Sequence, residues 1–115
     1  MTPRNALLAL FATFFVAMLA VTVHASLDRS VLLAAGEIWA DPWGKATLFD
    51  TYFAFLTCYL WMAYREPGWG RRVLWLLLVL TLGTFAISAY TIRALLQLPP
   101  DASLGQLLER PARSR

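Results

Sequence analysis

The sequence predicts an all-α integral membrane bundle of three transmembrane helices, with a short interfacial segment between the first and second. The chain has 115 residues, of which 59% are hydrophobic and only 15% charged, whereas soluble domains are about 25% charged. Three apolar runs of roughly 20 residues are each long enough to cross a hydrocarbon core of about 30 Å. The ten Lys and Arg residues fall almost entirely outside these runs, where they can anchor helix ends at lipid headgroups.

The first apolar run, residues 6–23, carries no charge and predicts a helix over about residues 6–25, after an N-terminal flank of residues 1–5. A secretory signal peptide is the alternative, because Val23 and Ala25 are small residues at the −3 and −1 positions of a possible cleavage point, and Arg4 supplies a basic start. The run exceeds the usual apolar length of about 7–15 residues in signal peptides. We therefore predict a retained helix.

The connection over residues 26–44 has a mixed character. Asp28 can cap a short helix over residues 29–40, whose apolar members recur at nearly helical spacing: Val31, Leu32, Ala35 and Trp39. Asp41-Pro42 then ends it. With Trp39 and Trp43 at its end, the segment is typical of a helix lying in the headgroup layer, although an irregular loop fits the same residues.

The second and third runs complete the transmembrane domain, residues 6–98. Residues 46–64 contain a single charge, Asp50, and end where Pro67-Gly68 stops a helix. Residues 73–92 carry no charge, and the helix is expected to continue to residue 98, before Pro99-Pro100. The tail, residues 99–115, is polar and basic. Its one apolar patch, Leu104, Leu107 and Leu108, allows either a turn of interfacial helix or disorder.

The distribution of Lys and Arg predicts the orientation. The N-terminus and the connection between the second and third helices are basic, whereas the first connection has more acidic residues. The positive-inside rule then places the N-terminus in the cytoplasm of a multi-pass protein, in a bacterial inner membrane. The C-terminal part of the chain opposes this assignment, because a third crossing would carry four arginines outside, at positions 93, 110, 113 and 115.

Small residues predict how the helices associate, since close contact rather than hydrophobicity drives packing in lipid. The first helix has a stripe at steps of three and four: Ala6, Ala9, Thr13, Ala17 and Ala20. The third helix has a second such stripe: Thr81, Thr84, Ser88 and Thr91. We expect both stripes to be used mainly for helix packing.

Antiparallel threading of three helices predicts one polar intramembrane cluster, formed by His24, Asp50, Tyr90 and Arg93 at one membrane face. An ionised Asp50 inside a hydrophobic helix is costly unless it is paired, hydrated or protonated. Arg93 is the expected ion partner, and Tyr90 a hydrogen-bond donor. The cluster could be a proton- or ligand-linked site. The structural alternative, which we favour, is that Asp50 caps or hydrates its helix or fixes helix register through Arg93.

The residues for most known chemistries are missing from the sequence. One His and one Cys cannot assemble a metal site at familiar spacings, and we expect no metal, cofactor or catalytic residue. A haem held by His24 alone is a weaker alternative. The basic residues form no stripe interleaved with aromatic residues, so we expect no nucleic-acid partner.

Residues 43–98 carry motifs in a specific order. They are Ala46-Thr47-Leu48-Phe49-Asp50-x-Tyr52, Trp61-x-Ala63-Tyr64-Arg65-Glu66, Trp69, Trp75, Leu82-Gly83-Thr84, Ala89-Tyr90 and Leu96-Gln97-Leu98. On these residues the chain resembles a membrane protein family of bacteria and plants known as domain of unknown function 1475. The resemblance implies a small multi-helix membrane protein. It implies no activity and transfers no site residues.

These observations predict an uncharacterised non-enzymatic accessory or structural subunit, or a small homo-oligomer. Its expected partners are the lipid bilayer and other membrane subunits or further copies of itself. The alternative is a small transporter or channel component in which Asp50 is the coupling residue. A membrane enzyme or cofactor holder using His24 and Asp50 is the third hypothesis.

Overall fold

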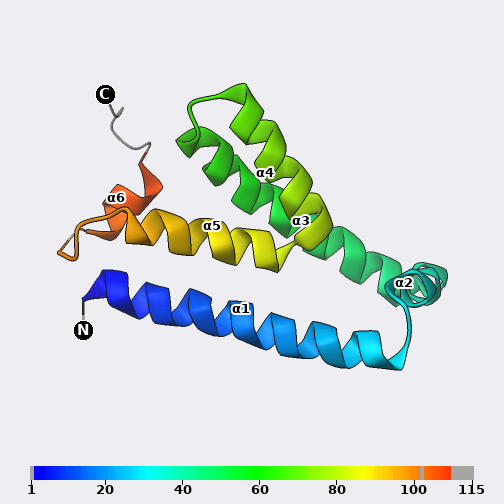
Figure 1. Ribbon diagram of the computed structural model, residues 1–115. Coiled ribbons are helices and arrows are strands. Elements are labelled where there is room, and N and C mark those ends of the chain that lie inside the picture. Colours follow the sequence, from blue (N-terminus) through cyan, green and yellow to red (C-terminus); the bar gives the residue numbers. More distant parts are fainter. Residues whose placement is uncertain (1, 102, 110–115) are drawn as a thin grey trace.

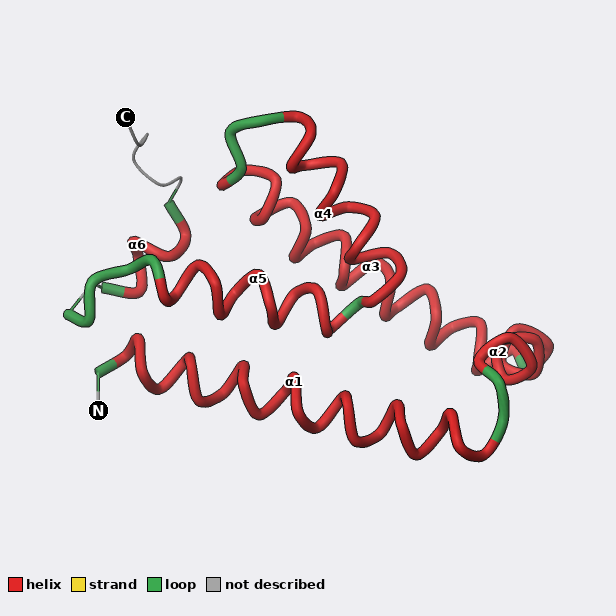
Figure 2. Tube along the Cα trace, viewed as in Figure 1, coloured by secondary structure: helices red, strands yellow, loops and turns green. Residues whose placement is uncertain are grey.

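The computed structural model describes residues 2–101 and 103–109, and these residues form helices joined by short connections (Figures 1 and 2). The helices are α1 (Pro3–Asp28), α2 (Val31–Ala40), α3 (Pro42–Arg65), α4 (Trp69–Leu82), α5 (Thr84–Leu96) and α6 (Leu104–Leu108). The predicted all-α class is confirmed, with no strand in the described ranges. The molecule is elongated, with extents of 49 × 33 × 22 Å.

Local sequence sets the corner between α2 and α3. Asp41 accepts a hydrogen bond from the Gly44 amide at 2.8 Å, and Pro42 occupies the first turn, so α3 starts with a favourable cap. The predicted short helix before it is confirmed as α2, but its predicted cap is wrong. Asp28 is the last residue of α1, and the Ser30 hydroxyl caps α2 by accepting from the Leu33 amide at 3.2 Å.

The predicted continuous helix over residues 73–98 is divided at Gly83 into α4 and α5. Gly83 has φ +56° and ψ −120°, a backbone conformation that L side chains avoid and that reverses the chain. Val79 and Ala86, four residues before and three after the break, then share one buried core. Apolar periodicity cannot reveal such a break, because both halves are hydrophobic.

The helices α1, α3, α4 and α5 form a folded-back arrangement. α1 runs alongside α5, while α3 lies against α4, and α2 joins the far ends of α1 and α3 (Figure 1). One core cluster lies between α3, α4 and α5: Met62, Val79, Ala86 and Tyr90. A second lies where α1, α5 and α6 meet: Ala94, Leu95 and Leu107, with Leu7, Leu8 and Phe11 of α1 against it.

The stripe of small residues on α1 does not make this packing. All five of its members are exposed, at positions 6, 9, 13, 17 and 20. Instead α1 turns its larger side chains toward α5, and the rings of Phe15 and Phe85 meet edge to face at 5.3 Å between centroids. The prediction for this stripe is therefore wrong within the single chain.

Among the described helices, α1 alone is long and apolar enough to cross a membrane by length and composition. A signal sequence near an N-terminus passes the same test. α3 has 24 residues but also contains Asp50 and several tyrosines. The three-crossing bundle predicted from the sequence is thus not established by these helices.

The tail contributes to the fold up to residue 109. The predicted helical turn in its apolar patch is α6, and the Ser103 and Gln106 side chains form a reciprocal capping box at its start. Leu107 is buried against the second core cluster. The remaining part of the tail, residues 110–115, lies outside the described residues.

Candidate functional site

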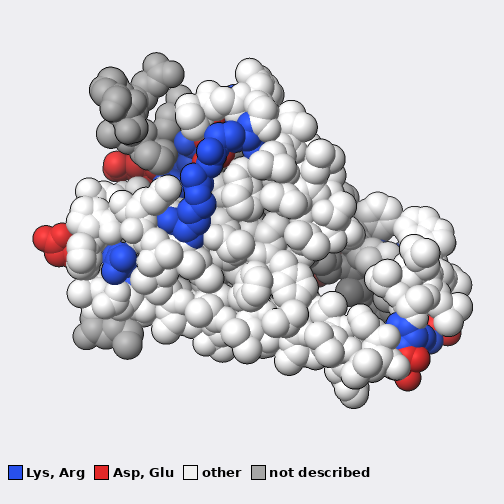
Figure 3. Space-filling model, in the orientation of Figure 1, with Lys and Arg blue, Asp and Glu red and all other residues white. Residues whose placement is uncertain are grey.

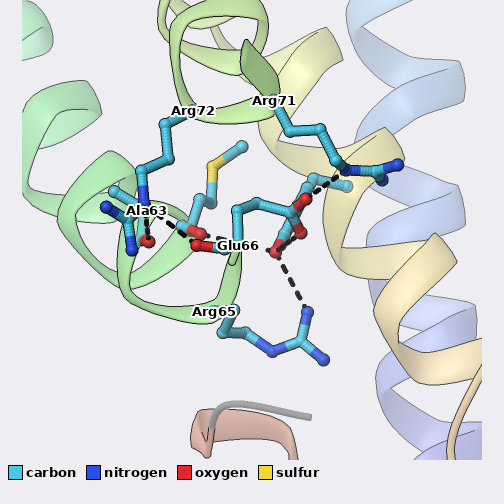
Figure 4. Close-up of polar contacts among 7 residues, drawn as sticks. Ala63, Arg65, Glu66, Arg71 and Arg72 are labelled. Carbon is cyan, nitrogen blue, oxygen red and sulfur yellow. Dashed lines mark hydrogen bonds and ion pairs between the residues drawn. The ribbon is translucent and has the colours of Figure 1, made fainter. Parts of the chain in front are cut away.

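A buried cluster of charged side chains lies where α3 ends and α4 begins (Figure 4). Arg65, the last residue of α3, is 3% exposed, and Glu66, which follows it, is 5% exposed. Charged residues are almost never this buried unless they are paired. We call Arg65, Glu66, Arg71 and Tyr90 the polar cluster.

Tyr90 connects the polar cluster to α5. This residue is 1% exposed, and its hydroxyl donates to Oε2 of Glu66 at 2.7 Å while accepting from Nη1 of Arg65 at 3.1 Å. Both hydrogen-bonding directions of the hydroxyl are therefore used. One phenol holds the end of α3 against the middle of α5.

Arginines of the first turn of α4 complete the network. Arg71 donates from Nε to Oε1 of Glu66, so both oxygens of this carboxylate are engaged. Arg72 donates from Nε to the backbone oxygens of Ala63 at 3.0 Å and Glu66 at 2.9 Å. These carbonyls lie at the C-terminus of α3, where a helix lacks internal donors and its dipole favours a cation.

The surroundings of Glu66 keep it ionised. Burial by itself raises its pKa, but the hydrogen bonds from Tyr90 and Arg71, together with the charges of Arg71 and Arg93, outweigh burial. The net result is a pKa below the ordinary value of 4.5. At neutral pH Glu66 is a carboxylate that accepts hydrogen bonds and does not hold a proton for transfer.

Aromatic rings surround the guanidinium of Arg65. Its Cζ lies 5.6 Å from the ring centroids of Trp61 and of Tyr90, within the range of cation–π attraction. The Tyr90 ring meets Trp75 edge to face at 4.8 Å between centroids. The charge of Arg65 is thus stabilised by ring faces as well as by hydrogen bonds.

The tail helix covers this end of the molecule. Trp61 donates from Nε1 to the Leu107 carbonyl at 3.3 Å, and Arg65 donates from Nε to the Glu109 carbonyl at 3.4 Å. At the other side, Arg4 of α1 donates from Nε to the Leu95 carbonyl at 3.0 Å. The polar cluster therefore lies at the end of the bundle where α1, α3, α4, α5 and α6 converge.

The four residues predicted as a cluster are divided between the two ends. Tyr90 belongs to the polar cluster, and Arg93 lies close enough to lower the pKa of Glu66. Asp50 and His24 are exposed, and neither makes a hydrogen bond or ion pair within the described ranges. His24 instead lines a cavity of about 730 Å³ between α1 and α2.

The expected pair of Asp50 and Arg93 is not formed in the described part of the chain. The reason is the reversal at Gly83. It returns α5 toward the start of α1, where Arg4 contacts Leu95, instead of carrying Arg93 on to the end that holds Asp50. The antiparallel threading that predicted this pair assumed an unbroken third helix.

The arrangement is suited to holding helices together. Each ionic group of the polar cluster has its partners, and the described residues contain no group of three or more His, Cys, Asp or Glu that could hold a metal ion. The Arg71 side of the Glu66–Arg71 ion pair is half-exposed, so the stabilisation comes mainly from the buried hydrogen bonds among Glu66, Tyr90 and Arg65, and hydrogen bonds to charged groups contribute about 1.5–3 kcal/mol. The cluster therefore fixes the angle between α3, α4 and α5.

Sequence reasoning did not single out Arg65 and Glu66 and therefore missed the polar cluster. A signal was present, because both residues belong to the motifs on which the resemblance rests, as does Tyr90. Nothing in the order of residues indicated that position 90 would lie beside position 66.

Comparison with known families agrees with the resemblance. A family model described as "Protein of unknown function (DUF1475)" matches residues 5–108, so the match extends beyond residues 43–98 to include α1 and α6. Neither the curated proteins nor the solved structures contain a match.

Proposed function

Since the chain belongs to the DUF1475 family, whose description names no activity, we propose its function from its geometry: a membrane-embedded, non-enzymatic accessory subunit or small homo-oligomer. In this proposal α1 and α3 cross the bilayer. The α4–α5 pair is a re-entrant hairpin that enters and leaves at the same face. The polar cluster fixes the base of that hairpin.

The distribution of charge is the observation that carries the proposal. In the view of Figure 3, charged side chains lie at the two ends of the long axis and in a band of basic residues that runs inward from one end along the upper side, whereas the rest of the middle of this face is uncharged. That middle surface exposes large apolar side chains, including Val21 at 63%, Phe53 at 63% and Leu60 at 69%. Such an exposed apolar surface is costly in water and favourable in hydrocarbon.

Helix lengths support two crossings and a hairpin. At 1.5 Å per residue, the 26 residues of α1 and the 24 of α3 extend about 39 and 36 Å, more than the roughly 30 Å of hydrocarbon. The 14 residues of α4 and 13 of α5 extend only about 21 and 20 Å. Neither half of the hairpin crosses by itself.

The hairpin also removes the conflict in the orientation. A third crossing would carry the tail to the opposite side, whereas a re-entrant pair returns it to the side of Arg4, Arg71 and Arg72. The positive-inside rule then assigns this basic end, including the start of the tail, to the cytoplasm. The opposite end has the mixed charges of Asp28, Arg29 and Glu37.

An accessory or oligomeric role is supported by the way the polar groups are used. The hydrogen bonds of the polar cluster join α5 to the residues at the end of α3 and the start of α4. The exposed small residues of α1 leave room for close approach of another helix, as in membrane helix pairs. The exposed Asp50 has no polar partner among the described residues, so no contact supports a coupling role.

Cysteine accessibility tests the topology. In a Cys58→Ser background, single cysteines replace Gly36, Gly70 and Asp101, and intact bacterial cells are treated with a membrane-impermeant maleimide. The expected result is that Gly36→Cys reacts from outside, while Gly70→Cys and Asp101→Cys react only after the cells are opened. A Cβ added at either glycine would have no heavy atom within 4 Å, so these two changes should be tolerated.

Three outcomes would contradict the proposal. Reaction of Asp101→Cys from outside would indicate a third crossing. Release of the protein by carbonate washing would exclude membrane embedding altogether. For the role itself, an Asp50→Asn variant should assemble in detergent with the same mass as the wild type; loss of solute uptake in vesicles containing only this protein would favour a transporter.

A further inference from the structure

An apolar groove follows α5 on the side next to α1. Its first part, of about 490 Å³, is lined by Phe15, Ala89, Ile92, Arg93, Leu96 and Gln97. A second apolar hollow of about 410 Å³ adjoins it at Phe15 and Ala89 and continues toward Leu82 and Phe85. On α5, positions 85, 89, 92 and 96 recur at steps of four, three and four, so they share one face, and Arg93 lies four residues after position 89 on the same side. We call the two parts together the α5 groove.

Arg93 lies at the basic end of the α5 groove, and its guanidinium N–H groups donate no hydrogen bond in the described part of the chain. Its side chain is half-buried, and within the described ranges it makes no hydrogen bond and no ion pair. The charge of Arg93 lowers the pKa of Glu66, but both carboxylate oxygens of Glu66 are already engaged by Tyr90 and Arg71. A guanidinium with five donors therefore borders an apolar channel without an acceptor.

The length of the α5 groove matches one membrane leaflet. From Gly83 to Arg93 is ten residues, or about 15 Å of helix at 1.5 Å per residue. Half of the hydrocarbon core is about 15 Å. The groove thus extends from the headgroup level at Arg93 to the depth where the α4–α5 hairpin turns, at Gly83.

We propose that the α5 groove binds one anionic phospholipid from the leaflet at the basic end. Its phosphate accepts hydrogen bonds from Arg93, and one acyl chain lies along Ala89 and Phe85. This proposal rests on the membrane embedding proposed above. Arginine suits the role because its planar fork donates two parallel hydrogen bonds to a phosphate.

The charge of this end favours an anion over a neutral lipid. Five arginines of the described chain gather here, at positions 4, 65, 71, 72 and 93, against three acidic residues at positions 66, 101 and 109. The net charge of this end is therefore positive. The lining itself is apolar apart from Arg93 and Gln97, which suits a hydrocarbon chain below a single headgroup contact.

Native mass spectrometry tests the binding. The purified protein is inserted into vesicles of dioleoylphosphatidylcholine with one fifth dioleoylphosphatidylglycerol, extracted in mild detergent and examined for retained lipid. We expect one phosphatidylglycerol per chain, enriched over phosphatidylcholine relative to the vesicle. Arg93→Gln should reduce this preference about tenfold, equivalent to about 1.4 kcal/mol. Arg29→Gln removes an equal charge at the other end and is the matched control.

A second variant tests the groove independently of charge. Ala89→Trp fills the junction of the two parts and should abolish retention of any lipid while keeping Arg93. Circular dichroism of each variant checks that helix content is unchanged. Soluble glycerophosphate should not displace the lipid, because it lacks the acyl chain.

Four results would overturn the proposal. They are equal retention of the two lipids, an unchanged preference in Arg93→Gln, lipid retention in Ala89→Trp, and displacement by glycerophosphate. Protein–protein dimers replacing lipid in the spectra would instead identify a second copy as the occupant. Failure of the protein to float with the vesicles would count against membrane embedding itself, and so is distinguishable from failure of the lipid site.

Discussion

Replacing Gly83 by alanine should strongly destabilise this protein, although the residue lies in an apolar stretch that looks helical. Gly83 adopts φ +56° between α4 and α5. A side chain added there would also place its Cβ 2.7 Å from two ring atoms of Phe55 on α3. Ordinary carbon–carbon contacts lie at about 3.5–4.0 Å, so the phenyl ring must move or the hairpin must open.

The magnitude follows from two unfavourable contributions and one favourable one. A non-glycine residue held in a sparsely populated backbone region costs about 1–3 kcal/mol. Forcing an extra carbon into a packed site costs about 1–3 kcal/mol. The lost freedom of the unfolded chain offsets at most about 1 kcal/mol. We expect the free energy of unfolding to fall by about 1–6 kcal/mol.

Equilibrium unfolding in mixed detergent micelles measures this effect. The protein is titrated with sodium dodecyl sulfate, and tryptophan fluorescence and helix content are followed together. Gly36→Ala is the matched control, because Gly36 lies inside α2 with no heavy atom within 4 Å of an added Cβ. This control should leave stability unchanged or raise it by up to about 1 kcal/mol.

The sign of the change decides between two structures. In the unbroken helix that the sequence predicts, Gly83→Ala would stabilise by about 1 kcal/mol, as alanine does at a helix interior. A stabilised Gly83→Ala protein would therefore refute the break and the re-entrant hairpin with it. Gly83→Ala in a Phe55→Ala background should recover the steric part of the loss and leave the backbone strain.

Three further predictions concern single sites. Glu66→Gln should lower the free energy of unfolding at pH 7 by about 1.5–3 kcal/mol, since it removes charged hydrogen bonds. The fold lowers the pKa of Glu66 below its ordinary value of 4.5. The wild type should therefore keep this stabilisation above about pH 4.5 and lose it as the pH falls through the pKa that Glu66 has in the folded protein. Unfolding titrations of Glu66→Gln should lack this pH dependence. Gly44→Ala should disrupt the α2–α3 corner, because the added Cβ would collide with the Ile38 carbonyl. The single cysteine of Gly36→Cys should then react faster with maleimide when Gly44→Ala is also present, and an unchanged rate would argue against the disruption. Ser88→Ala should be neutral or stabilising by up to about 1 kcal/mol, because the buried Ser88 hydroxyl has no hydrogen-bond partner in the described chain. A thermal unfolding midpoint lowered by several degrees would instead show that this hydroxyl has a partner.

Much of the helical content could be predicted from local residues. The first and second long helices, the short helix before Pro42 and the turn at Leu104–Leu108 all follow from apolar runs bounded by Pro, Gly and capping residues. The family could be recognised as well, because its motifs lie in fixed order along the chain. These features depend on neighbours close in sequence.

The candidate site could be predicted only in part. Tyr90 was singled out, but its partners were not, because Arg65 and Glu66 are 25 and 24 residues away. The expected pairing of Asp50 with Arg93 was wrong because it also depended on contacts between residues far apart in the sequence. The reversal at Gly83 redirects every residue after it, so contacts across the bundle depend on the backbone conformation of a single residue.

Composition and the spacing of apolar, proline and glycine residues determined by themselves that this chain is helical and hydrophobic, with basic residues at the ends of its apolar runs. Only the tertiary structure decided that the third hydrophobic stretch doubles back, that Glu66 is buried between Tyr90 and Arg71, and that Arg93 is left beside an apolar groove. The physical reason is that hydrophobic periodicity reports which residues avoid water. It carries no information about the direction in which a glycine turns the chain.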